Sequence, residues 1–387
     1  MIPVYYDGSN WIYADIKKEW YDYDKKEWAN AVVLNSGITK NVGDTITEEE
    51  IALWYVWIPR YTYTIFNGNN GSVNEQEIQI KFENGTNSSG TVECLDAVSG
   101  SGTSSETCTD TTNGSIKNGT STYTHPAFTF GNQELTGFWV GKFEVSGSTS
   151  QITIKPNITS LRNQTVSSFF TAIQNMSTTY SLNGDSHMIK NMEWGAVAYL
   201  SHSKYGTCTN GSCLEIGVNN YSGYVTGCGA TAGSSQSAGC NQYNTSIGML
   251  ASTTQNIYGV YDMSGGALEY VMGNMVYRDG SFYSSNGKFT TIPNSKYYDK
   301  YTYNDISNTD HNRGKLGDAT KETLKIFGNI YGGWYGDYSV FPCADHSWIA
   351  RGGRYFGGTS TELGIFYYLY NPGAGNQDYT SRAILCK

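Results

Sequence analysis

Residues 351–358 read Arg-Gly-Gly-Arg-Tyr-Phe-Gly-Gly, residues 363–372 read Leu-Gly-Ile-Phe-Tyr-Tyr-Leu-Tyr-Asn-Pro, and residues 378–382 read Asp-Tyr-Thr-Ser-Arg. The glycine pairs provide tight turns and backbone with positive φ. The tyrosines between them are too dense for a core to bury with every hydroxyl bonded. Tyrosine also offers a large, stiff, amphipathic contact area. We interpret the segment 351–382 as a binding face; the alternative is an aromatic-rich edge strand of an ordinary sandwich.

The bulk composition narrows the class of protein. A chain of 387 residues is long enough for one large domain or two. Only 15% of the residues are charged, whereas the chain has 45 Gly and 32 Tyr, which is typical of a loop-rich, β-leaning extracellular protein. The net charge is −9 and no basic run occurs, so we expect no nucleic-acid partner and no contact with an anionic membrane.

The sequence also predicts where the protein works. No apolar run approaches the ~20 residues that span a bilayer. The opening Met1-Ile2-Pro3 does not begin a signal peptide. We expect an extracellular or cell-surface location, with the export signal or anchor outside this sequence and a pilus, a cell surface or a phage particle as the tether.

Eight cysteines indicate an oxidising compartment. Six form close pairs around loops rich in Gly, Ser, Thr and Asn, and the last two bracket the tyrosine-rich segment, so we expect all eight to be paired: Cys94 with Cys108, Cys208 with Cys213, Cys228 with Cys240, and Cys343 with Cys386. A four-thiolate zinc site formed by the middle four is the alternative. It is disfavoured because the spacing is not Cys-x2-Cys and no histidine lies among them.

The chain divides into two parts by pattern. Residues 1–45 alternate strand and turn signals and predict a small β-hairpin module, with the polar segment 35–50 as its linker. Such a module is too small to be stable alone and should dock on the main domain, residues 46–387, or on a partner. Within the main domain, helices are predicted at 166–176, at 191–203 with Asn191 as cap, and at 318–327 with Asp318 as N-cap and Gly328 as stop; nearly everything else is strand or loop.

Five collinear sequence blocks resemble the formylglycine-generating (sulfatase-modifying factor) family, whose fold is an elaborated C-type lectin domain. They are 55–61 (Tyr-Val-Trp-Ile-Pro-Arg-Tyr), 138–146 (Phe-Trp-Val-Gly-Lys-Phe-Glu-Val-Ser), 192–199 (Met-Glu-Trp-Gly-Ala-Val-Ala-Tyr), 256–270 (Asn-Ile-Tyr-Gly-Val-Tyr-Asp-Met-Ser-Gly-Gly-Ala-Leu-Glu-Tyr), and 351–353 (Arg-Gly-Gly) with 381–382. The resemblance covers about residues 54–385. It implies an α+β, C-type-lectin-like fold with long loops.

The enzymes of that family act through two cysteines that hold copper, and the matching positions here are Gly357 and Glu362. Neither residue supplies a thiolate for Cu(I), so we expect no enzyme. The family also has a calcium site near the fourth block, but Gly266 stands where the family has an asparagine ligand. We therefore expect no cofactor and no bound metal, with calcium as the one ion left open.

Two carboxylates in the fourth block have a structural and a catalytic interpretation. Asp262 and Glu269 are expected to be buried and to accept hydrogen bonds from turn N–H groups or from the guanidinium groups of Arg351 and Arg382. The alternative is a general acid–base pair, which would need a cleft around the two groups. We favour the structural role.

The chain is most similar to one branch of this fold, the variable proteins of diversity-generating retroelements, in which mutation of template adenines diversifies surface residues. This resemblance implies a non-catalytic protein that binds an external protein or glycan through a diversified surface. A calcium-dependent glycan lectin is the first alternative, and a copper oxidase is the second. The candidate ligand-binding residues are Arg354, Tyr355, Phe356, Tyr367, Tyr368, Leu369, Tyr370, Asn371, Asp378 and Tyr379, with Trp334 either extending the face or lying in the core.

Overall fold

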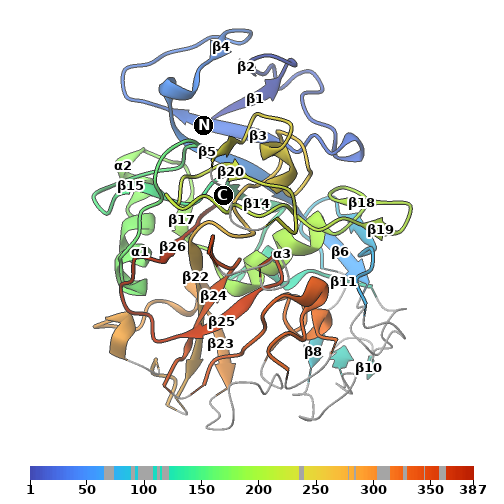
Figure 1. Ribbon diagram of the computed structural model, residues 1–387, viewed down its shortest axis with the longest axis vertical. Coiled ribbons are helices and arrows are strands. Elements are labelled where there is room, and N and C mark those ends of the chain that lie inside the picture. The colour runs from blue at the N-terminus through green and yellow to red at the C-terminus, as the bar shows by residue number, and fades with distance from the viewer. Residues whose placement is uncertain are drawn as a thin grey trace.

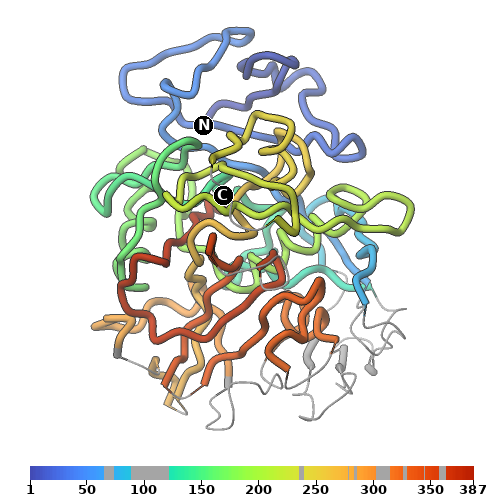
Figure 2. The backbone as a smooth tube through the Cα atoms, in the orientation of Figure 1, coloured from blue at the N-terminus to red at the C-terminus, as the bar shows by residue number. Residues whose placement is uncertain are grey.

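The structure is a computed structural model of the chain (Figures 1 and 2). It describes residues 1–387 except 65–73, 89–91, 95–107, 111–113, 116–121, 235–238, 278, 283–284, 303–313, 326–328, 344 and 357–362. The described chain is predominantly β, with few helices. Figure 2 shows the blue N-terminal segments at one end of the molecule and the orange and red C-terminal segments toward the other.

An antiparallel sheet of eight strands forms the upper part of the molecule in Figure 1, in the order β17-β27-β14-β5-β3-β1-β2-β4. Its strands are β1 (Ile2–Tyr6), β2 (Trp11–Tyr13), β3 (Asn30–Leu34), β4 (Thr45–Ile46), β5 (Ile51–Pro59), β14 (Gly137–Gly141), β17 (Asp185–Met188) and β27 (Ala383–Cys386). Strand β5 is buried along most of its length because side chains of both hydrophobic clusters cover it. Its run of β-branched and aromatic residues suits such a position.

The strands of residues 1–45 continue this sheet. Strand β3 pairs with β5 in the register Val32↔Trp54, so the N-terminal segment docks by backbone pairing. The segment 35–50 was expected to be a linker, but it contains β4, which pairs Ile46 with Trp11 of β2. The linker prediction is wrong there because Ile46 is buried beside that tryptophan. A division into two domains at residue 45 stays a prediction.

A second sheet carries the C-terminal segment. Strand β22 (Leu268–Val276) pairs with β23 (Asp299–Thr302), β24 (Trp348–Arg351) and β26 (Tyr379–Ser381), and β25 (Tyr368–Asn371) pairs with β24. All nine residues of β22 are buried, which makes it the centre of this sheet.

Short hairpins and small sheets fill most of the remaining described chain. They are β6 (Tyr61–Thr64), β7 (Ile80–Phe82) and β11 (Thr122–Thr124); β8 (Val92–Cys94), β9 (Cys108–Asp110) and β10 (Gly114–Ser115); β12 (Thr129–Phe130) and β13 (Gln133–Glu134); β15 (Ser146–Ser148) and β16 (Gln151–Thr153); β18 (Cys208–Thr209) and β19 (Ser212–Cys213); and β20 (Cys228–Gly229) and β21 (Asn241–Gln242).

Two of the three predicted helices are confirmed. Residues 166–176 form α1 (Val166–Gln174), which is followed by α2 (Met176–Thr179). Residues 191–203 form α3 (Asn191–Ser201), but its N-cap is Lys190, and the Asn191 side chain instead donates to the Tyr301 hydroxyl at 2.7 Å. Among the described residues, no helix is long and apolar enough to cross a membrane.

The helix predicted at 318–327 is wrong. The described part of that segment contains one turn of 3-10 helix, Lys321–Thr323. Ala319 has a φ of 55°, which breaks a helix at its first turn. Arg351 also donates to the carbonyl oxygens of Asp318 and Ala319 at 3.2 and 3.1 Å, which fixes this backbone in an irregular conformation. The expected stop at Gly328 lies outside the described residues.

Candidate ligand-binding surface

The exposed part of the C-terminal segment begins at a turn after β24. Gly352 and Gly353 have φ values of 83° and 73°, which residues with a Cβ rarely adopt. A Cβ on Gly353 would lie 2.5 Å from a side-chain carbon of Leu363. The turn is held by hydrogen bonds from Gly265 N to Gly352 O and from Tyr355 N to Gly266 O, at 2.6 and 2.9 Å. The backbone that presents Arg354, Tyr355 and Phe356 is therefore fixed by the buried fourth block.

The side chains beyond this turn form a stack of cations and aromatic rings. The Arg354 guanidinium lies 4.3 Å from the Phe356 ring centroid. Phe356 meets Tyr355 edge to face at 4.7 Å, and Tyr355 meets Tyr224 edge to face at 4.5 Å. The Arg162 guanidinium completes the stack, 4.3 Å from the Tyr224 centroid. Such contacts stabilise exposed rings by about 0.5–1 kcal/mol each, so they order the surface before a ligand arrives.

Asp378 joins this stack electrostatically. Its Oδ1 accepts a 2.8 Å hydrogen bond from the Tyr224 hydroxyl, and its Oδ2 lies 3.5 Å from Arg354. Burial and the bond to Asp378 raise the pKa of Tyr224, which keeps its hydroxyl protonated as a donor. We call Arg162, Tyr224, Arg354, Tyr355, Phe356 and Asp378 the Arg354 patch. It holds two cations and one anion.

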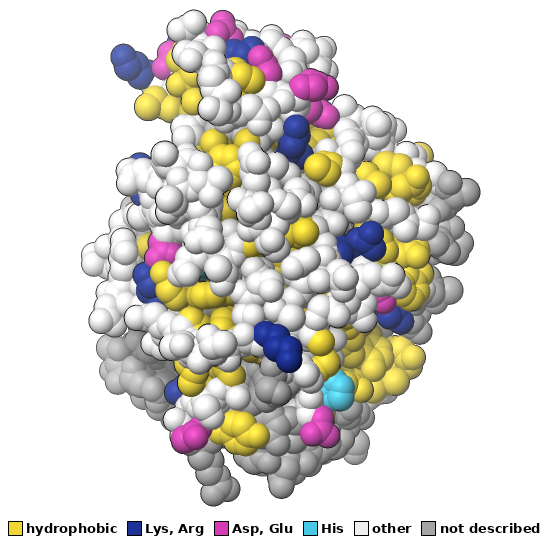
Figure 3. All heavy atoms as spheres, turned by 90° about the vertical axis from the view of Figure 1, so that its left-hand side faces the viewer, with side chains coloured by type: hydrophobic (Ala, Val, Ile, Leu, Met, Phe, Trp, Pro, Cys, Tyr) yellow, Lys and Arg dark blue, Asp and Glu magenta, His cyan; other side chains and the backbone are white. Residues whose placement is uncertain are grey.

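A local excess of positive charge is unusual on this protein, whose net charge is −9. Figure 3 shows that the charged side chains on one face of the molecule are few and scattered among polar and hydrophobic ones. Phe356 is 39% exposed and the Arg354 side chain is 42% exposed, so both are open to a ligand. The patch can contact an aromatic or sugar ring by stacking and an anionic group by charge.

Several candidate residues lie inside the protein, which corrects the expectation of a binding role for four of them and places the fifth, Trp334, in the core, one of the two positions expected for it. They are Trp334, Tyr367, Tyr368, Asn371 and Tyr379, each at most 8% exposed. Their partners come from distant elements: the Tyr368 ring packs 5.5 Å from the Arg351 guanidinium, and the Tyr379 ring stacks on Tyr270 at 4.7 Å. Asn371 Oδ1 also accepts a hydrogen bond from the Tyr270 hydroxyl. These side chains support the sheet and are not available at its surface.

Leu369 and Tyr370 are half-buried and leave β25 on opposite faces, because side chains alternate along a strand. Leu369 packs on the hydrophobic cluster that contains Trp348 and Tyr379. Tyr370 meets His346 edge to face at 4.9 Å. The sequence Tyr-Tyr-Leu-Tyr therefore cannot form one continuous face, and Tyr370 lies apart from the stack around Arg354.

Two members of the patch, Arg162 and Tyr224, were not predicted from the sequence. Both come from loops well before the C-terminal segment. Tyr224 follows glycine in the run Tyr221-Ser222-Gly223-Tyr224, a pattern of the same kind as in the C-terminal segment, which was a usable signal. No sequence pattern marks Arg162 as a member of the patch, because only the fold brings it next to Tyr224.

A buried ionic network lies beneath the patch. Arg382 and Glu269 form an ion pair with both side chains fully buried, as expected for one of the two arginines. Asp262 accepts from Gly227 N at 2.9 Å and from the Asn219 amide at 2.8 Å. Arg351 does not take part and instead bonds Asn191 and nearby carbonyl groups. The structural role of both carboxylates is supported, because both side chains are buried and bonded to donors of the protein.

The space around Gly266 argues against the calcium alternative. This residue has a φ of 71°, and a Cβ there would lie 2.5 Å from Glu144 Oε1. Glu144 therefore occupies the space of the side chain that the family places at this position. Its Oε1 accepts from Ala267 N at 3.0 Å, and its Oε2 contacts the Ser160 hydroxyl. The carboxylate oxygens at this place are engaged by donors of the protein itself, which disfavours calcium.

Glu144 should make stability depend on pH. Burial, followed by the negative charges of Asp262 and Glu269, raises its pKa well above the ordinary value of 4.5. A raised folded-state pKa means that the stabilising contribution is complete below about pH 4.5 and is lost as pH rises through the folded-state pKa.

We therefore expect Glu144→Gln to increase the free energy of unfolding at pH 8 by about 1–3 kcal/mol relative to wild type, with little difference at pH 4.5. Urea unfolding of both proteins across this range measures the difference. Glu19→Gln, at an exposed position, is the matched control and should change neither value. A wild type that gains stability relative to Glu144→Gln as pH rises would contradict the expectation.

A second buried cluster combines His187, Glu193 and Cys386, whose ligand atoms lie within 4.8 Å of one another. His187 Nε2 is 3.0 Å and Lys190 Nζ is 3.6 Å from the same oxygen of Glu193. Burial, the largest single influence, opposes protonation of His187, but the negative charge of Glu193 and the hydrogen bonds to Asp185 and Glu193 together outweigh it and raise the pKa of the imidazole. A metal ion here would face the Lys190 ammonium, so we expect none to bind. The positions that match the copper cysteines, Gly357 and Glu362, lie outside the described residues.

The cysteines follow the predicted pairing in part. Disulfides join Cys208 to Cys213 and Cys228 to Cys240, which overturns the zinc alternative for these four. Cys343 and Cys386 are free thiols, so the prediction that they pair is wrong. Cys386 lies in β27 of the eight-stranded sheet, whereas Cys343 precedes β24 of the other sheet. The side chains of Cys94 and Cys108 lie outside the described residues, although their backbones face each other between β8 and β9.

No protein-family model and no curated protein matches the sequence. Similar solved structures include Treponema denticola variable protein 1, with 12% identity, a TM-score of 0.31, and coverage of 77% of this chain and 95% of that chain. PvdO from Pseudomonas aeruginosa has 8% identity and a TM-score of 0.29, covering 87% of this chain and 95% of its own. The Major Tropism Determinant I1 variant has 11% identity and a TM-score of 0.31, covering 98% and 92%. These values describe a loose relationship of fold.

Proposed function

We propose that the protein is a non-catalytic ligand-binding protein and that the Arg354 patch is its ligand-binding surface. The observation that carries this proposal is the ordered stack from Arg354 to Arg162, which leaves Phe356 and the Arg354 guanidinium open to solvent. Aromatic and arginine side chains supply most of the binding energy in protein interfaces, at about 2 kcal/mol or more for each residue that becomes fully buried. Their pre-ordering lowers the entropy cost of binding.

We further propose a C-type-lectin-like fold of the formylglycine-generating type. Support comes from where the five sequence blocks lie. The first and second blocks fall mainly on β5 and β14, which are neighbours in one sheet, and the fifth ends at Arg382, directly before β27 of that sheet. The third forms α3, and the fourth leads into β22, which pairs with β24 at Glu269↔Arg351. Blocks that are far apart in the sequence thus assemble into one core.

An extracellular or cell-surface location is part of the proposal. The disulfides Cys208–Cys213 and Cys228–Cys240 support it, because such bonds persist in oxidising compartments. We also propose that Arg354, Tyr355, Phe356 and Asp378 vary between copies of the gene while the glycines beneath them stay constant. Sequencing the 3′ end of this gene across one population tests this idea, and a uniform sequence would remove it.

Removal of the exposed side chains should abolish binding without unfolding the protein. We expect Arg354→Ala/Phe356→Ala to weaken binding by about a hundredfold, with a melting temperature within about 2 °C of wild type, because neither side chain belongs to the buried core. Labelled protein is applied to a glycan array and to a panel of bacterial and animal cells, and titrations on positive surfaces give the affinities.

Tyr277→Ala is the matched control, since this tyrosine is 43% exposed and does not belong to the patch. Its binding should equal that of wild type. A double variant that binds as well as wild type, or a wild type that labels none of the surfaces, would defeat the proposal. Binding that disappears on addition of EDTA would instead favour the calcium-dependent lectin.

A further inference from the structure

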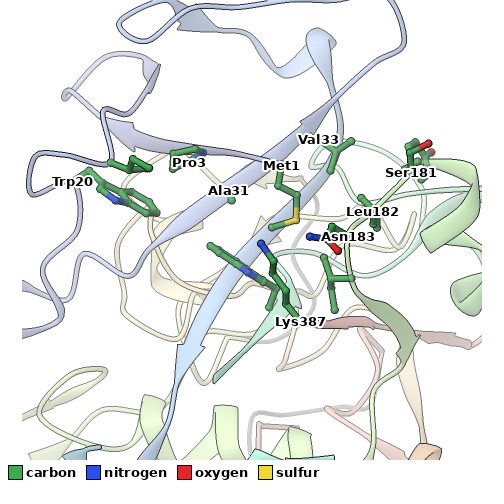
Figure 4. A pocket seen from close by; sticks show the side chains of 13 residues that line it. Met1, Pro3, Trp20, Ala31, Val33, Ser181, Leu182, Asn183 and Lys387 are labelled. Atoms are coloured by element: carbon green, nitrogen blue, oxygen red, sulfur yellow. The ribbon is translucent and has the colours of Figure 1, made fainter. Parts of the chain in front are cut away.

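A pocket of about 380 Å³ lies where the N-terminal strands meet the main domain (Figure 4). Pro3 of β1 and Ala31 and Val33 of β3 line one side, and Trp139 of β14 and Leu385 of β27 line the other. It is formed by parts of the chain that are distant in sequence, and it shares no lining residue with the Arg354 patch. The volume suits a small molecule with one ring.

The walls of this pocket are largely apolar. Figure 4 shows the Trp20 side chain reaching in from the N-terminal segment and Leu182 from the segment after α2. Trp139 is half-buried, and its ring packs on Trp57 at 5.1 Å, which fixes its orientation. Two indole rings that stay partly exposed in the absence of a ligand provide a surface on which an apolar or aromatic body can pack.

Lys387 carries the one charged side chain among the described residues that line the pocket. Figure 4 shows the Lys387 amine and the Asn183 amide directed toward the Met1 side chain, in the middle of the lining residues. No hydrogen bond or ion pair joins either group to any residue that the structure describes. The described lining residues include no aspartate or glutamate.

We propose that this pocket binds a small carboxylic acid with an apolar or aromatic body. The body packs between Trp20 and Trp139, and the carboxylate accepts hydrogen bonds from the Lys387 ammonium and the Asn183 amide. Charge complementarity selects this class, because the Lys387 ammonium attracts a carboxylate and repels an amine, whereas a neutral ligand forms no ion pair with it. This site is independent of the Arg354 patch.

Three probes that share one ring and one chain length test the proposal: 3-phenylpropionate, 3-phenylpropan-1-ol and 3-phenylpropylamine. Quenching of the fluorescence of the intact chain reports binding, because two tryptophans line the pocket. We expect the carboxylate to bind at least about fivefold more tightly than the alcohol, and the amine to bind more weakly still. Lys387→Glu should reverse the order of the two affinities, so that the amine binds more tightly than the carboxylate.

Lys387 is exposed, so its replacement leaves the fold intact, and Lys81→Glu, at another exposed lysine, should keep the wild-type order. Arg354→Ala/Phe356→Ala should also bind 3-phenylpropionate as wild type does, which separates this proposal from the proposed function. Absence of binding by all three probes, equal binding of all three, or an unchanged order in Lys387→Glu would overturn the proposal.

Discussion

Replacement of Arg382 by leucine is expected to lower the free energy of unfolding by about 3–5 kcal/mol, because a buried ion pair that loses one partner leaves an uncompensated charge. Arg382 is fully buried. Its Nε donates to Glu269 Oε2 at 3.0 Å, and its two terminal nitrogens donate to Gly141 O and Tyr261 O at 2.8 Å each. The side chain thus joins β14, the fourth block and β22, and its loss removes a donor from both oxygens of Glu269 and from two carbonyl oxygens.

Urea unfolding at pH 7, followed by tryptophan fluorescence, measures this loss. Arg382→Lys should recover part of the stability, since an ammonium keeps the charge but lacks the planar set of donors. The matched control is Arg354→Ala, whose partner Asp378 lies 3.5 Å away at the surface, and the cost there should stay below about 1 kcal/mol. Similar losses at both arginines would show that the buried network does not hold the two sheets together.

Replacement of Gly195 by alanine is expected to destabilise the protein by about 1–3 kcal/mol, although alanine is the better helix former by about 1 kcal/mol. Gly195 lies inside α3, and a Cβ there would lie 1.9 Å from Gly317 O and 2.9 Å from the backbone of Asp318. Both contacts are with backbone, which cannot rotate away as a side chain can. The helix packs so closely on this segment that a Gly→Ala substitution, which usually stabilises a helix, is expected to destabilise this one.

Gly239→Ala is the control, because a Cβ there would meet nothing within 4 Å and the backbone does not have a positive φ. It should leave the stability unchanged or raise it slightly. Thermal unfolding of the two variants under one condition gives the comparison. A melting temperature for Gly195→Ala that equals or exceeds that of wild type would contradict the expected contact.

The elements with a strong local pattern could be predicted from the sequence. The spacing of Trp194, Val197, Ala198 and Leu200 indicates α3, and each of these side chains is buried. The segment 318–327 has an equally good N-cap signal but does not form the helix, because Arg351 binds its carbonyl groups from another strand. A local pattern contains no information about such a partner.

The same limit explains why the sequence did not indicate which rings of the candidate surface are exposed. The composition of residues 354–379 indicates a tyrosine-rich face, but whether a ring is exposed depends on the strands beside it. Tyr379 is buried because Tyr270 of β22 lies against it, and Tyr355 stays half-exposed at a turn. Arg162 and Tyr224 reach the patch only through the fold. Sequence composition therefore predicted which segment carries the candidate surface, whereas only the three-dimensional structure shows which side chains are exposed on it.

The place of β27 has a consequence for synthesis. This strand lies between β14 and β17, so residues near 140 pair with residues near 384, and the Arg382 bond to Gly141 spans 241 positions. Most of the polypeptide must leave the ribosome before β14 and β17 acquire β27 as their neighbour. Contacts between such distant residues slow folding, and unpaired strand edges invite aggregation meanwhile. Chaperone capture of the nascent chain, or export before folding, is thus the expected route to the native state.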